Sequence, residues 1–207
     1  MAAEQRRPGN DLRTRTLEEA TAVIAEHGLA SLTMASLAKR LGTSGGHLLY
    51  YFRSKDLLLV EALRYSEAAL TEERAALLTR RVRPARRVEL FVDLYLPAGP
   101  RDPRWMLWIE LWARAGTNAE LRSAQEELDR GWQRDLEAVI ARGVDLGAFA
   151  VDDVAGRSAQ LLALLDGLST RVVLSQSGTE RAQATALAHS AAAALIPRSA
   201  DAGEGRP

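Results

Sequence analysis

The stretch LTMASLAKRLGTSGGHLLYYF, residues 32–52, decides the fold of the amino-terminal part of this 207-residue chain. It predicts two short helices joined by a tight turn. Thr33 and Ser44 stand where a side-chain oxygen accepts hydrogen bonds from the first N–H groups of a helix. Gly42 supplies the positive φ that such a tight turn requires. Two short helices joined in this way form a helix-turn-helix.

The inner and outer faces of this motif follow from its apolar spacing. Leu37, Ala38 and Leu41 form the inner stripe of the first helix, and Leu48 of the second helix packs back against Leu37 and Ala38. Either Tyr51 or Phe52 fills the module core, because two adjacent residues cannot share one helix face. The residues that this arrangement leaves facing outward are Thr43, Gly45, Gly46, His47 and Tyr50.

The pattern T-x-x-x-L-A-x-x-L-G-x-S-x-G-x-L-x-Y-Y-F-x-S-K-D-x-L, residues 33–58, resembles the amino-terminal domain of the TetR family of bacterial repressors. The resemblance implies that Thr33 bonds a DNA phosphate through its hydroxyl and backbone N–H. It implies the same role for Lys55 at the start of the fourth helix. The DNA-binding residues that it assigns are Thr33, Thr43, Ser44, Gly45, Gly46, His47, Tyr50, Tyr51 and Lys55.

The outward surface departs from the commonest family pattern at two positions. Leu49 stands where the family usually has Tyr, and Gly45 stands where Lys, Pro or Thr is frequent. These departures leave His47 and Tyr50 as the expected base readers.

Each DNA-contact assignment has a structural alternative. Helix capping alone would explain Thr33 and Ser44. Core packing alone would explain Tyr50 and Tyr51. Lys55 would be an ordinary solvated partner of the acidic residue that follows it.

Composition limits the classes of function. The 27 basic and 27 acidic residues cancel, so DNA binding must rest on a local patch rather than on overall charge. Residues 1–60 hold eight Lys/Arg and six Asp/Glu, a net charge of +2, and their first four arginines form an arm able to reach DNA. The chain has no cysteine, no secretory signal and no membrane-length apolar run, which predicts a cytoplasmic protein.

The 3.6-residue apolar period recurs along the chain, whereas no strand-like alternation is found. We therefore expect an all-α fold of about nine helices, at about 12–28, 34–41, 44–51, 55–79, 85–96, 103–115, 119–143, 153–175 and 180–196. The expected organisation is a disordered arm (1–10), a helix-turn-helix domain (11–55), a helical ligand-binding and dimerisation domain (56–197) and a disordered tail (198–207).

The last two helices are the expected dimer surface. Residues 153–175 are apolar over more than half of the helix circumference, and residues 180–196 are rich in alanine. In the TetR family the last two helices of each subunit form a four-helix dimer bundle; the alternative is a buried monomer core. The expected interface residues are Leu161, Leu165, Leu168, Val172, Ala188 and Ala192.

Three tryptophans point to a ligand site. Trp105, Trp108 and Trp112 share one helix face, and indole rings suit an apolar or cationic small molecule, although core packing would also explain them. Asp166 interrupts an apolar run and needs an arginine, a backbone cap or a cationic ligand. The segments WIELWARA and LLDGL resemble the carboxy-terminal domain of BetI-like family members. The candidate pocket residues are Phe91, Tyr95, Trp105, Trp108, Trp112 and Asp166.

An enzyme and a helical scaffold are the competing classes. The three histidines, His27, His47 and His189, lie far apart, and the sequence contains no phosphate loop, no HExxH and no GxSxG elbow. We expect no catalytic residue, metal or cofactor. The predicted protein is a repressor that binds a pseudo-palindromic double-stranded DNA operator as a homodimer. A small-molecule effector is expected to shift the fourth helix and release the DNA.

Overall fold

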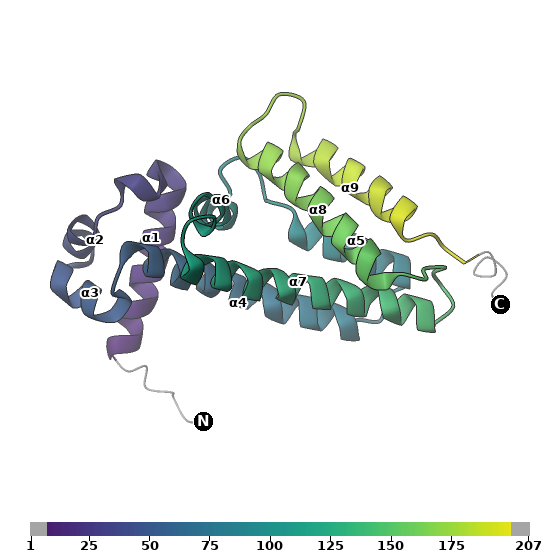
Figure 1. The fold of residues 1–207 in the computed structure, drawn as a ribbon, viewed down its shortest axis with the longest axis horizontal. Coiled ribbons are helices and arrows are strands. Elements are labelled where there is room, and N and C mark those ends of the chain that lie inside the picture. The colour runs from purple at the N-terminus through teal and green to yellow at the C-terminus, as the bar shows by residue number, and fades with distance from the viewer. Residues whose placement is uncertain (1–7, 200–207) are drawn as a thin grey trace. The chain divides into compact units, whose positions relative to one another are not determined.

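The computed structural model describes residues 8–199, and the regular structure of this part is helical, which confirms the expected all-α fold. The expected arm and tail fall mostly on residues 1–7 and 200–207, which lie outside the described residues. The described helices (Figure 1) are α1 (Pro8–Ser31), α2 (Met34–Leu41), α3 (Gly45–Phe52), α4 (Lys55–Thr79), α5 (Pro84–Tyr95), α6 (Pro103–Ala115), α7 (Ala119–Asp145), α8 (Val154–Val173) and α9 (Arg181–Leu195).

Two ends of the fold differ from the expected boundaries. Helix α1 begins at Pro8, so residues 8–10 are helical rather than part of a disordered arm. Arg13 and Arg15, two of the four arginines expected to form the arm, also lie within this helix. Arg198 was expected in the disordered tail but forms an isolated antiparallel bridge with Phe149. Two backbone hydrogen bonds hold this bridge, from Ala150 N–H to the carbonyl of Pro197 (2.9 Å) and from Ser199 N–H to that of Ala148 (3.1 Å).

The chain divides into two compact units, and the division differs from the expected domain boundary at residue 55. The first unit contains the chain up to Glu67 together with Arg101–Gln125. The second contains Ala68–Pro100 and the chain from Glu126 onward. Helix α6 therefore belongs to the unit that contains the helix-turn-helix.

Polar contacts explain why α6 packs on α1. Gly28 breaks α1 with a φ of 76°, and the N–H of Leu29 just after the break donates to the Glu110 carboxylate of α6 at 2.8 Å. The Arg101 guanidinium donates to carbonyl oxygens at the end of the main segment of α1. These contacts satisfy backbone groups that the break leaves without helical partners.

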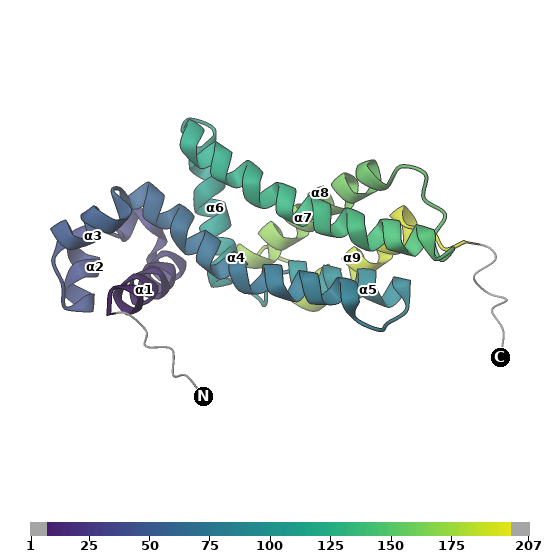
Figure 2. The same ribbon diagram turned by 90° about the horizontal axis from the view of Figure 1, so that it is seen from below.

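In the second unit, α8 and α9 form an antiparallel hairpin and lie side by side (Figures 1 and 2), and α5 packs against α9. Alanines at 184, 188 and 192 are buried on α9, where small side chains allow its neighbouring helices to approach closely. Arg74 in the second half of α4 forms an ion pair with Asp135 of α7 at 2.6 Å. Within the described residues, no helix is both long enough and apolar enough to span a membrane.

Candidate DNA-binding and ligand-binding sites

The predicted helix-turn-helix is present, with capped helices and a left-handed turn. The hydroxyl of Thr33 accepts from Ser36 N–H at 3.0 Å, and the Ser36 hydroxyl accepts from Thr33 N–H at 3.2 Å. Ser44 caps α3 by accepting from His47 N–H at 3.1 Å. Gly42 has a φ of 68°. The interpretation of Thr33 and Ser44 as helix caps is therefore confirmed.

The outer face of α3 carries aromatic rings. Leu48 and Phe52 are buried, so Phe52 rather than Tyr51 fills the module core. Tyr50 is 82% exposed and Tyr51 45% exposed, which excludes the alternative that they are core aromatics. His47 stacks on Tyr51 with 5.2 Å between ring centroids, and Tyr50 meets Tyr51 edge-on at 5.6 Å. These three rings form a cluster on the outer face of α3.

The two expected phosphate contacts at the motif edges have partners inside the chain. The Lys55 ammonium donates to the carbonyl of Leu29 at 3.1 Å, just after the break in α1. Asp56 lies 3.7 Å from the Arg114 guanidinium of α6 rather than pairing with Lys55. The hydroxyl and N–H of Thr33 are both engaged in capping α2. Phosphate contact by Thr33 and Lys55 thus stays a prediction.

Two glycines open α3, and neither is required by packing. A Cβ atom at Gly46 would meet nothing within 4 Å, and one at Gly45 would lie 3.6 Å from Ala35, an ordinary contact. Close approach of the backbone to DNA would explain glycine at these positions.

We predict opposite effects of Gly46→Ala on stability and on DNA affinity. The substitution should raise the free energy of unfolding by about 0.5–1 kcal/mol, because alanine has the higher helix propensity. It should weaken operator binding, because the new methyl group stands on the outer face of α3. Urea unfolding and gel-shift titration measure the two quantities. The matched control for operator affinity is Gly116→Ala, where an added Cβ atom would also meet nothing within 4 Å. Unchanged operator affinity in Gly46→Ala would show that the DNA does not approach this backbone closely.

The three predicted tryptophans come together in the first unit around a buried carboxylate. Trp105 and Trp108 are buried, and both rings contact Trp112, with centroids 5.9 and 5.8 Å apart. The indole N–H of Trp108 donates to Oε1 of Glu67 at 2.8 Å, and Glu67 is only 2% exposed. The Arg104 guanidinium lies 3.4 Å from the same oxygen. We refer to these five residues as the tryptophan cluster.

A second aromatic group, the Trp132 cluster, lies in the second unit. The buried Trp132 ring of α7 is met edge-on by Phe91 (5.6 Å between centroids) and Tyr95 (4.7 Å) of α5. The Arg74 guanidinium lies over the same ring at 3.9 Å from its centroid. The Tyr95 hydroxyl donates to Oδ1 of Asp166 at 2.5 Å. The cluster thus combines a cation-accepting indole face with carboxylates.

The predicted need of Asp166 for a partner is met by a phenol, which was not among the expected partners. Burial raises the pKa of Asp166 to about 6, and the nearby Asp129 charge adds to the rise, while the hydrogen bond from Tyr95 opposes it. This carboxyl therefore titrates close to neutral pH.

Sequence reasoning missed Glu67, Arg74 and Trp132. The first two could have been found from a charged residue within an apolar stripe. One face of α4 carries, at helical spacing, Leu63, Glu67, Arg74 and Leu77. The six predicted pocket residues divide between the tryptophan cluster and the Trp132 cluster. Among the described residues, no group of three or more metal-ligating side chains is present.

Most residues expected at a dimer interface are covered by the chain itself. Leu168 is only half-buried, and the apolar stripe it belongs to faces the rest of its own subunit. The apolar side chains that remain exposed on these two helices include Leu164, at 37%, and Leu187, at 57%. The expected interface residues that are instead buried within the chain are Leu161, Leu165, Val172, Ala188 and Ala192.

Comparisons with known proteins match both parts of the chain. Residues 17–62 match the family model described as bacterial regulatory proteins of the tetR family. Residues 84–197 match the model described as the BetI-type transcriptional repressor, C-terminal. The HTH-type transcriptional regulator BetI of Proteus mirabilis (strain HI4320) is 30% identical over 178 residues, covering 84% of this chain and 86% of that protein.

Solved structures show the same architecture. A transcriptional regulator from Saccharomonospora viridis, in complex with choline, superposes with a TM-score of 0.82 at 27% identity, covering 90% of this chain and 97% of that one. A TetR transcription regulator from Haloarcula marismortui gives a TM-score of 0.78 at 26% identity, covering 90% of this chain and 98% of that one.

Proposed function

Because the chain belongs to the TetR family of bacterial transcriptional regulators and has a BetI-type carboxy-terminal domain, we propose that it is a repressor released by a small organic cation. It binds a pseudo-palindromic operator as a homodimer. The observation that carries the choice of effector is the Trp132 cluster, in which a cation already lies over an indole face.

The DNA-binding part of the proposal rests on the outer face of α3. Tyr50, Tyr51 and His47 are exposed there on a helix whose opposite face anchors it in the module core. Such a helix presents its outer side chains to base edges in the major groove. Two copies related by a two-fold axis would read half-sites about 34–36 Å apart.

The dimer part of the proposal uses the exposed face of the α8–α9 hairpin. Leu164 and Leu187 are large apolar side chains that water contacts in the single chain. Burying such a face against a second copy stabilises a dimer through the hydrophobic effect.

The effector class follows from charge and ring geometry. An ammonium ion over an indole face gains about 0.5–2 kcal/mol, and more when water is excluded. Arg74 makes this contact with Trp132, and the carboxylates of Asp135 and Asp166 lie beside the same group of side chains. The Saccharomonospora viridis neighbour is in complex with choline, a quaternary ammonium compound. We propose an effector of that chemical class.

A coupling route is available along α4. Arg74 lies on this helix, which begins at Lys55. The Lys55 ammonium donates a hydrogen bond to the carbonyl of Leu29, and the Glu110 carboxylate of α6 accepts one from the N–H of the same residue. An effector that displaces Arg74 from Trp132 acts on α4. The resulting shift of α4 reaches α1 through the contact between Lys55 and Leu29. Effector binding would thus change the populations of two conformations of the DNA-binding part.

The test is a gel-shift titration with the promoter regions beside the gene that encodes the chain, in the presence and absence of choline. We expect salt-sensitive, sequence-selective binding that choline weakens, and choline affinity should fall by the same factor when operator is bound. Tyr50→Ala should weaken binding, whereas Tyr65→Ala on α4 is the matched control. Absence of selective binding to any of these regions contradicts the repressor proposal. Equal choline affinities with and without operator contradict the coupling.

A further inference from the structure

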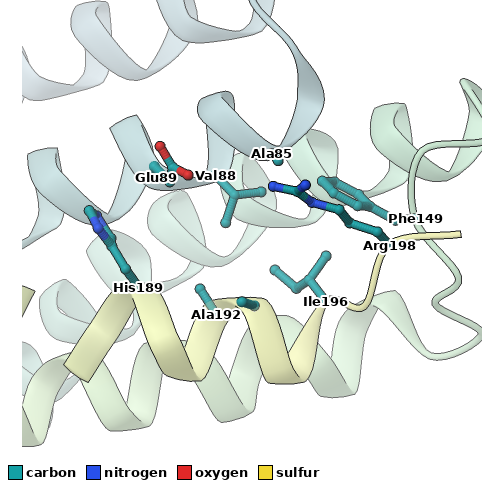
Figure 3. Close-up of a pocket in the computed structure, with 9 residues that line it drawn as sticks. Ala85, Val88, Glu89, Phe149, His189, Ala192, Ile196 and Arg198 are labelled. Atoms are coloured by element: carbon teal, nitrogen blue, oxygen red, sulfur yellow. The ribbon is translucent and has the colours of Figure 1, made fainter. Parts of the chain in front are cut away.

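A pocket separate from the two aromatic clusters lies between α5 and the carboxy-terminal end of α9 (Figure 3). It has a volume of about 70 Å³ and adjoins a wider groove of about 620 Å³ at the start of α5. The volume of the groove is within the range of small-molecule sites, and the smaller pocket continues it. The two cavities share Ala85, Glu89, Phe149 and Arg198.

The lining of this pocket is apolar inside and basic at its edge. Val88, Phe149 and Ile196 are buried residues that line it. Figure 3 shows the Arg198 side chain reaching from the segment after α9 toward Ala85 at the start of α5. Aliphatic and phenyl groups pack against an apolar chain, whereas a guanidinium donates two parallel hydrogen bonds to a carboxylate.

Charge around the pocket favours an anion. Glu89 pairs with Arg86 at 2.9 Å, and Asp93 lies 2.9 Å from His189, so both acids have partners. In the described part of the chain, Arg83 and Arg198 have no carboxylate within ion-pair distance. The groove begins in the stretch RRVRPARR, residues 80–87, which holds five arginines and no acid in a chain of zero net charge. Burial and the nearby Arg142 charge lower the pKa of Arg87, consistent with a positive potential at this corner.

The pocket wall is held in place by the fold. The bridge between Phe149 and Arg198 fixes the backbone of both residues. The Phe149 ring lies directly over Gly143 of α7, where a Cβ atom would stand only 2.1 Å from Cδ2 of the ring. The apolar wall and the backbone that carries the Arg198 side chain are thus positioned before any ligand arrives, which lowers the entropic cost of binding.

We propose that this pocket, lined by α5, α9 and the 148–150 and 197–199 segments, is a second ligand site that binds a small amphipathic carboxylate. The carboxylate pairs with Arg198 and the apolar chain lies against Val88, Phe149 and Ile196. The site is independent of the proposed organic-cation effector, because it uses none of the residues of the Trp132 cluster.

The test compares three probes of equal chain length by calorimetric titration of the full chain without DNA. Octanoate should bind with a Kd at or below about 1 mM, while octan-1-ol and octylammonium should bind at least about tenfold more weakly. Methyl resonances of Val88 and Ile196 should shift with octanoate. No detectable octanoate binding, or equal binding of octylammonium, overturns the proposal.

Two variants locate the binding. Arg198→Glu reverses the charge of an exposed side chain, and Ala193→Phe narrows the pocket from an exposed lining position, so both should fold normally. Each should weaken octanoate binding at least about tenfold. Arg134→Glu, the same charge reversal on an exposed residue of α7 outside the lining, should leave it unchanged. Octanoate affinity that is equal in Arg198→Glu, Ala193→Phe and the wild type would place the binding elsewhere and refute the site.

Discussion

Gly143→Ala is expected to lower the free energy of unfolding by about 2–4 kcal/mol, because it forces a methyl group into a filled space. The added Cβ atom would lie 2.1 and 2.2 Å from two carbons of the Phe149 ring. That ring is 4% exposed, and the backbone that carries it is held by the bridge to Arg198. Urea unfolding followed by circular dichroism measures the loss.

A double-mutant cycle with Phe149→Ala tests the cause. Phe149→Ala alone leaves a cavity and should cost about 3–5 kcal/mol. The double variant should be destabilised by about 1–3 kcal/mol less than the sum of the two single variants, because the new methyl group then enters the vacated space. Gly116→Ala, at a helical φ of −59° with no neighbour within 4 Å, should change stability by less than about 0.5 kcal/mol. Additive losses in the cycle would refute the steric explanation.

The helix-turn-helix was predictable because its determinants are local. Thr33, Gly42 and Ser44 each act on backbone groups within a few residues, so their roles can be inferred from spacing alone. The starts of α2 and α4 and both ends of α6 were placed correctly for the same reason, since a cap, a proline or a glycine marks each of them.

The positions that sequence reasoning missed depend on contacts between distant segments. Glu110 caps the break at Gly28 from 82 positions along the chain, and no local pattern indicates that pairing. Apolar periodicity gave the faces of α8 and α9 but could not distinguish the subunit core from a partner's surface. Leu161 and Ala188 were therefore assigned to an interface although the chain itself buries them. Trp132 was missed because its neighbours Tyr95 and Arg74 come from two other helices, which local sequence patterns do not bring together.

Asp166 is expected to make both stability and cation binding depend on pH. Its pKa is about 6 in the folded chain, against an ordinary value of 3.8. The contribution of this group to stability is therefore fully present below pH 3.8 and is lost as the pH rises through about 6. The loss amounts to at most about 3 kcal/mol, since one pKa unit corresponds to about 1.4 kcal/mol. Asp166→Asn should remove this dependence and be more stable than the wild type at neutral pH.

The cation affinity should show the opposite trend, because only the ionised carboxylate attracts an ammonium group. Choline binding, followed by calorimetry, should weaken about tenfold as the pH falls from neutral through about 6. The Asp166→Asn variant should bind choline weakly, with an affinity that does not change over this pH range. Tyr95→Phe removes the hydrogen bond that lowers the pKa of Asp166. The pH at which choline binding is half lost should therefore be higher in this variant. A wild-type profile that matches that of Asp166→Asn would show that the effector does not sense this carboxylate. The effector site would then have to be sought at Glu67, a buried acid whose partner Trp108 offers the same combination of indole and carboxylate.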